Sequence, residues 1–168
     1  MKNFLSQLHD KQAAVLAKID QLYEAANNLH DEGKVSHSRN VHAIDEVIGF
    51  FHEELLFHIE MEEMIIFPFL KKHIPRLDPV IQFLHGDHQD FKESFSFFQK
   101  SFEQFKKDQD DAERRKVIEK LRDKATYLFC LMRSHIKMEA DSIYKVCVTE
   151  LNKEEQKELL AYFEHPKI

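Results

Sequence analysis

The chain has 168 residues, enough for one domain with a sizeable buried core, and only 3 glycines and 4 prolines, which favours long helices over a turn-rich sheet. Its net charge of −6 argues against nucleic acid or an anionic membrane as a partner. No apolar run reaches the roughly 18 residues that a membrane-spanning helix requires.

Four long helices and one short helix are predicted in chain order. They are expected over residues 4–29, 40–67, 78–107 and 112–148, with the tail helix over residues 153–163. Pro68 should weaken or kink the second helix, and the segment through Pro75 should be irregular. Asp78 and Pro79 supply a capping side chain and a first-turn proline for the third helix, and Asn152 caps the last. Long helices joined by short loops predict an all-α, up-down-up-down four-helix bundle with a short C-terminal helix.

The two cysteines, Cys130 and Cys147, are expected on one helix. At 1.5 Å per residue they would lie about 25 Å apart, too far for a disulfide. The N-terminal segment turns polar too soon for a secretory leader. We therefore expect a cytoplasmic protein that forms a single domain over residues 1–168.

The predicted buried faces of the second, third and fourth helices are apolar except at one short polar interruption each. Positions spaced by three and four residues read Val41, Ile44, Ile48, Phe51, Leu55, His58, Glu62, Ile65 and Phe69; then Ile81, Leu84, His88, Phe91, Phe95, Phe98, Phe102 and Phe105; then Leu121, Ala125, Leu128, Met132, His135, Glu139, Ser142 and Val146. Each interruption contains a histidine, and two of them add a glutamate four residues later. Burying a glutamate without a partner costs several kcal/mol. Neutral imidazoles and carboxylates suit a bound metal pair, so the pattern predicts a buried metal site.

Spacing alone does not distinguish a ligand pair from a surface pair. His42 and Glu46 have the same spacing as His58 and Glu62 but fall off the buried face, so we interpret them as a surface pair. Taken singly, each buried histidine also fits a hydrogen-bonded core residue. Recurrence in the two halves of the chain favours ligation, because residues 4–9 resemble residues 83–88 and residues 58–62 resemble residues 135–139. Two such helix pairs would close around a pseudo-two-fold axis with matching ligands for two metals.

At these residues the sequence resembles the hemerythrin-like, or HHE cation-binding, family. The similarity covers about Phe4 to Val148, and residues 58–68 are its most specific part, with His-x-x-x-Glu followed by an apolar pair and Phe-Pro. The resemblance implies the hemerythrin four-helix bundle and an oxo- or hydroxo-bridged pair of iron ions. It also implies the roles of six residues: His58 and His135 as terminal ligands, Glu62 and Glu139 as bridging carboxylates, His88 as the third-helix ligand and His9 as the first-helix ligand.

The sequence departs from oxygen-carrying members of the family at three places. Those members have two third-helix histidines spaced by four, whereas His85 and His88 are spaced by three, so His85 is either a ligand or a histidine at the pocket rim. Ala140 stands where they have an aspartate, and Glu139 matches the iron-repair and sensor branches instead. His9 lies near a terminus, where helices fray. Two tyrosines are interpreted either as donors to the ligands or as edge packing: Tyr127 and Tyr144.

The predicted function is binding or sensing of a small oxidant (O2, NO or peroxide) at the iron pair. One alternative is iron-sulfur cluster repair or iron donation, although that branch often carries an extra cysteine-containing domain. Others are peroxide degradation and a metal-free helical interaction module. Ferritin-like oxidases use Glu-x-x-His, which this sequence lacks. Nitrogen and oxygen ligands would also accept manganese or zinc.

Overall fold

The computed structural model describes residues 4–107 and 110–164, with side chains over 9–107 and 110–162, and within these ranges it contains helices and no strand. The elements in chain order are the α-helices and short 3₁₀ or π turns α1 (Phe4–Asp31), η1 (Lys34–Ser36), α2 (His37–Phe50), η2 (Phe51–Leu55), α3 (Leu56–Met61), η3 (Glu62–Ile66), α4 (Phe67–His73), η4 (Pro75–Leu77), α5 (Asp78–Lys106), α6 (Asp111–Met138), η5 (Glu139–Tyr144), α7 (Lys145–Glu150) and α8 (Lys153–Glu164). The prediction of an all-helical protein is confirmed.

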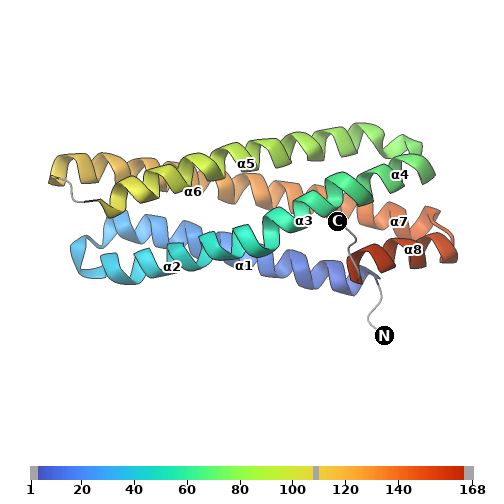
Figure 1. Cartoon of the computed structure of the whole chain (residues 1–168), viewed down its shortest axis with the longest axis horizontal. Coiled ribbons are helices and arrows are strands. Elements are labelled where there is room, and N and C mark those ends of the chain that lie inside the picture. The colour runs from blue at the N-terminus through green and yellow to red at the C-terminus, as the bar shows by residue number, and fades with distance from the viewer. Residues whose placement is uncertain (1–3, 108–109, 165–168) are drawn as a thin grey trace.

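Four long helical stretches lie side by side, and consecutive stretches run in opposite directions (Figure 1). They are α1, the continuous run from α2 to α4, α5, and the run from α6 to α7. The first stretch packs against α2 and α6, α5 packs against α6, and α8 contacts η3. No helix in the described part of the chain is long and apolar enough to cross a membrane.

The helix ends follow the predicted signals with two corrections. The second stretch continues past Pro68 to His73. Pro68 lies just after the π turn η3, where the regular hydrogen bonding of the α-helix is already interrupted. Asp78 begins α5 as predicted but does not cap it, since its carboxylate instead accepts from Lys71 at 2.7 Å and from Gln82 at 2.8 Å. Asn152 caps α8 as predicted, accepting two backbone N–H groups. Part of the predicted turn before α6, residues 108–109, lies outside the described residues.

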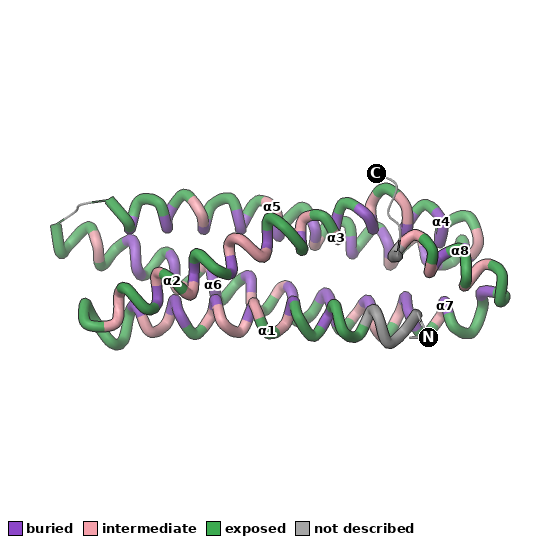
Figure 2. Tube along the Cα trace, turned by 60° about the horizontal axis from the view of Figure 1, so that its bottom comes forward, coloured by how far each residue is buried: buried purple, intermediate pink, exposed green. Residues whose placement is uncertain are grey.

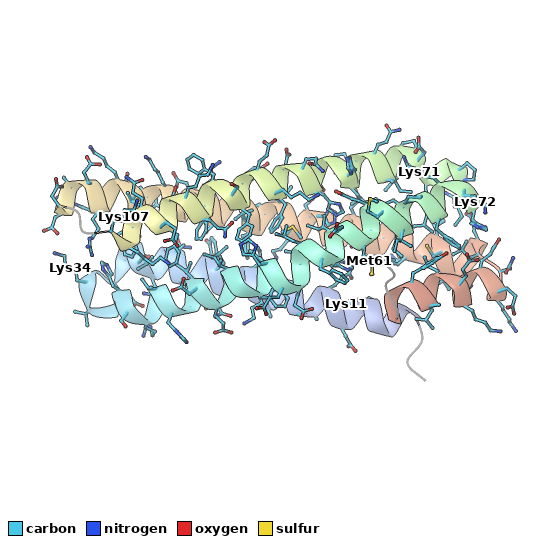
Figure 3. The ribbon with its side chains drawn as sticks, viewed as in Figure 1. Lys11, Lys34, Met61, Lys71, Lys72 and Lys107 are labelled. Atoms are coloured by element: carbon cyan, nitrogen blue, oxygen red, sulfur yellow. The ribbon has the colours of Figure 1, made fainter. Side chains whose placement is uncertain are left out.

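Buried apolar residues form two clusters. Figure 2 shows buried positions recurring between exposed ones along the helices of the bundle. Every predicted position on the third helix is buried. In the larger cluster the ring of Phe51 lies edge-on to Phe91 and Phe95, with centroids 5.4 and 5.2 Å away. Each such fully buried side chain stabilises the fold by about 1.5–3 kcal/mol. Lysines such as Lys71 lie exposed at the periphery, whereas Met61 is buried (Figure 3).

Three π-helical turns interrupt the regular helices, and two of them begin at the glutamates of the predicted site, Glu62 in η3 and Glu139 in η5. A π turn takes one extra residue per turn, so the buried face beyond it moves along the sequence by one position. The predicted core positions Ile65, Ser142 and Val146 are accordingly only partly buried. The next residues in sequence are buried instead: Ile66, Ile143 and Cys147.

Candidate metal centre

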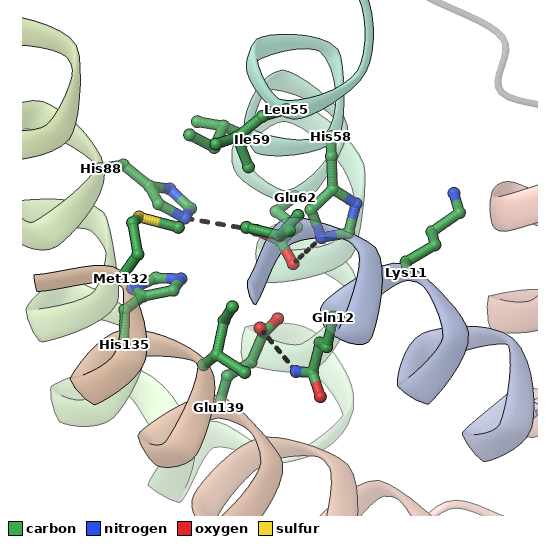
Figure 4. Close-up of a pocket in the computed structure, with 12 residues that line it drawn as sticks. Lys11, Gln12, Leu55, His58, Ile59, Glu62, His88, Met132, His135 and Glu139 are labelled. Carbon is green, nitrogen blue, oxygen red and sulfur yellow. Dashed lines mark hydrogen bonds and ion pairs between the residues drawn. The ribbon is translucent and has the colours of Figure 1, made fainter. Parts of the chain in front are cut away.

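Five of the predicted ligands come together in one small cavity inside the bundle (Figure 4). They are His58, Glu62, His88, His135 and Glu139. The cavity has a volume of about 20 Å³, enough to admit a water-sized guest among these side chains. The apolar side chains that line the cavity all belong to the larger cluster: Val15, Leu55, Ile59, Met132 and Ile136. On α5, His88 lies between Leu84 of the smaller cluster and Phe91 of the larger one.

Glu62 lies at the centre of the group and faces histidines from two helices. Its Oε1 atom is 3.0 Å from Nε2 of His58, and its Oε2 atom is 3.3 Å from Nε2 of His88. Potential ligand atoms form two groups that share this residue: Glu62 with His88 and His135, and His58 with Glu62 and Glu139. Within each group the atoms lie within 4.8 Å of one another. A carboxylate shared in this way can contact two cations at once.

Two of the histidines are held by a carboxylate at their outer nitrogen. Nδ1 of His88 is 3.1 Å from Glu63, and Nδ1 of His135 is 3.3 Å from Asp87. Lys92 fixes Glu63 in turn, with Nζ 2.9 Å from its second oxygen. A carboxylate at Nδ1 keeps the proton there and leaves Nε2 as a free electron-pair donor facing inward, which is the usual support of a metal-binding imidazole.

Tyr144 reaches the same carboxylates from η5. Its phenol donates a hydrogen bond to Oε1 of Glu139 and lies 3.4 Å from Oε1 of Glu62. The π turn makes this contact possible, because backbone bonds from residue i to i+5 bring Glu139 and Tyr144 onto one face of the helix. Tyr127 instead is exposed, with its hydroxyl 3.5 Å from Asp90.

The pKa values of the two buried carboxyl groups in the cavity are shifted in opposite directions. Burial raises the pKa of Glu62, but the neighbouring imidazoles, His58 above all, outweigh it and hold that pKa well below its ordinary value. Burial and the adjacent Glu62 carboxylate raise the pKa of Glu139 well above its ordinary value. Without metal, Glu62 therefore carries the charge and Glu139 the proton, because two like charges in one buried site are costly.

The geometry fits a bound cation better than a set of core hydrogen bonds. Two buried ring nitrogens, Nδ1 of His58 and Nε2 of His88, have no hydrogen-bond partner, although the latter is close to Glu62. Such an unsatisfied buried group costs about 1–3 kcal/mol. A cation among two carboxylates and three imidazoles would satisfy Nε2 of His88 and neutralise the paired carboxylates.

The remaining predicted ligands lie away from this cavity. His9 is exposed and borders a separate pocket with Tyr144 and Lys145. His85 is exposed too, with Nδ1 3.3 Å from Glu63, outside both groups of potential ligands among the described residues. His42 and Glu46 are exposed as predicted, and Glu46 pairs with Lys18.

Sequence analysis missed the residue that the first helix does contribute. Gln12 is buried, and its side-chain amide donates to Oε2 of Glu139 at 3.1 Å. The internal repeat could have identified Gln12 if its two halves had been aligned differently. When Leu8 and His9 are aligned with Leu84 and His85, Gln12 is aligned with His88. Gln12 precedes His58 by 46 residues and His88 precedes His135 by 47, whereas His9 precedes His58 by 49.

The fold and this cavity agree with a comparison of the sequence with known families. The family model of the hemerythrin HHE cation binding domain matches residues 3–147. The match ends before the tail helix α8 and includes all five predicted ligands in the cavity. No curated protein matches the chain. The chain belongs to the hemerythrin HHE cation-binding family.

Proposed function

We propose that this chain is a cytoplasmic non-haem di-iron protein that binds or senses a small oxidant, namely O2, NO or a peroxide. The observation that carries the proposal is the pair of ligand groups sharing Glu62, with Nε2 of His88 buried and without a hydrogen-bond partner. In this proposal the helices form the up-down-up-down hemerythrin bundle. His58, His88 and His135 would hold the ions through their ring nitrogens, and Glu62 and Glu139 would hold them through their carboxylates.

The chain itself would position the ions and keep their surroundings dry. Glu63 and Asp87 hold the rings of His88 and His135 with Nε2 facing inward. Tyr144 contacts both carboxylates, and the apolar side chains of the larger cluster that line the cavity would limit the access of bulk water. An iron pair, when bound, would supply redox chemistry and open coordination positions for the oxidant. Glu139, whose pKa is raised, would have to lose its proton for both carboxylates to hold the ions.

Elemental analysis and absorption spectroscopy of freshly purified protein test the proposal. We expect iron in the protein and a visible spectrum that changes when air is admitted. Return of the first spectrum when oxygen is removed would support reversible binding, whereas release of oxygen from added peroxide would support the enzymatic alternative. Protein that contains no iron and takes up none when Fe(II) is added without air would contradict the proposal.

A further inference from the structure

The two groups of potential ligands differ in their nitrogen donors. Position 1 is the group Glu62, His88 and His135, which offers two imidazoles. Position 2 is the group His58, Glu62 and Glu139, which offers one imidazole and two carboxylates. An imidazole is a better ligand than a neutral amide for iron, cobalt and zinc, so the number of imidazoles bears on affinity.

Position 1 is rigid. The side chains of His88 and His135 are only 1% and 4% exposed, and each is held at Nδ1 by a carboxylate from another residue. The ring of Phe67 also stacks on the ring of His88, with centroids 5.7 Å apart and planes inclined by 8°. Both imidazoles are thus oriented before any ion arrives, which lowers the entropic cost of binding.

Position 2 lacks this support. The side chain of His58 is 15% exposed, and its Nδ1 atom has no hydrogen-bond partner that would fix the ring. Glu62 presents to this position the oxygen that already contacts both His58 and the phenol of Tyr144.

The internal repeat indicates why position 2 has one imidazole fewer than position 1. His88 on α5 approaches Glu62, and Gln12 occupies the equivalent place on α1 and approaches Glu139. The amide nitrogen of Gln12 donates a hydrogen bond to that carboxylate, whereas an imidazole there would offer a lone pair. Because glutamine rather than histidine occupies this place, position 2 lacks the nitrogen ligand that His88 offers to position 1.

We propose that the centre loads in two unequal steps, with a tightly held ion at position 1 and a weak, exchangeable ion at position 2, and that Gln12 sets this difference. The inference rests on the proposed function only in requiring that the cavity bind metal. Because position 2 is rich in oxygen, its ion belongs to the class that accepts such donors, Fe(II) or Mn(II).

Titration of the chelator-treated full-length protein with Co(II), followed by calorimetry and visible absorption, tests the inference. We expect two steps in the wild type and one ion left after desalting. His58→Ala should lose the second step and keep the first. Gln12→His should tighten the second step by about tenfold or more, the scale on which even supporting residues alter metal affinity, and retain two ions after desalting.

His9→Ala is the discriminating variant, because His9 is one turn from Gln12 on the same helix. The inference requires both steps to persist in this variant, and loss of the second step would show that α1 ligates through His9. Two equal steps in the wild type would also overturn the inference while leaving the metal centre intact. A wild type that binds no Co(II) and no Fe(II) would overturn the proposed function and the inference together. Should Gln12→His not fold, the His58→Ala and His9→Ala titrations still decide.

Discussion

Glu62→Ala should abolish the stabilisation of the protein by metal, because Glu62 is the one residue common to both ligand groups. At free metal one hundred times above its Kd, binding to the folded state alone adds about 2.7 kcal/mol of stability. For a chain of this length, 1 kcal/mol moves Tm by about 2–4 °C, so metal should raise the wild-type Tm by about 5–10 °C. The variant should show no such rise.

The assay is thermal unfolding followed by circular dichroism, with and without Fe(II) under anaerobic conditions, together with elemental analysis of desalted protein. The rise in Tm on adding metal is the quantity to compare, because the variant also changes the stability of metal-free protein: it removes a partner of His58 and the charge that raises the pKa of Glu139. Glu46→Ala is the matched control, since Glu46 follows His42 at the same spacing but is exposed and paired with Lys18. The control should keep the full rise. A Glu62→Ala protein that retains two irons and the wild-type rise would refute the assignment of Glu62.

Three further outcomes follow from the site. Asp87→Asn weakens the anchor of His135, so metal affinity measured by competition with a chelator should fall by about 10–100-fold, and an unchanged affinity would show that the contact is incidental. Acid should release the metal as imidazoles protonate between about pH 5 and 6.5, so iron still bound after desalting at about pH 4.5 would argue against histidine ligands. Burial and the Glu62 carboxylate raise the pKa of Glu139, so the stability that its protonated form contributes is full below the ordinary value of 4.5 and is lost as pH rises. Glu139→Gln imitates the protonated form and should raise the Tm of metal-free protein more at about pH 8 than at about pH 4.5, and an equal change at both values would contradict the charge assignment.

Much of the architecture follows from the sequence because α-helical periodicity is a local property. The buried face of α5 was predicted without error, since its helix is regular over its whole length and the spacing of three and four residues persists. The same periodicity brought His58, Glu62, His88, His135 and Glu139 to one level of the bundle. Buried glutamates and histidines can be recognised from the sequence alone, because they interrupt a helical face that is otherwise apolar.

Tertiary contacts decided the rest. Whether a helix widens into a π turn depends on what its side chains meet across the core, so the shift from Ser142 to Ile143 and the reach of Tyr144 toward Glu139 could not be read from spacing. Which α1 side chain faces the cavity depends on how far that helix slides along its neighbours, and the structure selected Gln12 over His9. The sequence by itself determined which residues are buried and at which position along the bundle. Only packing determined which atoms meet, because the relative register of the helices depends on contacts between residues distant in the chain.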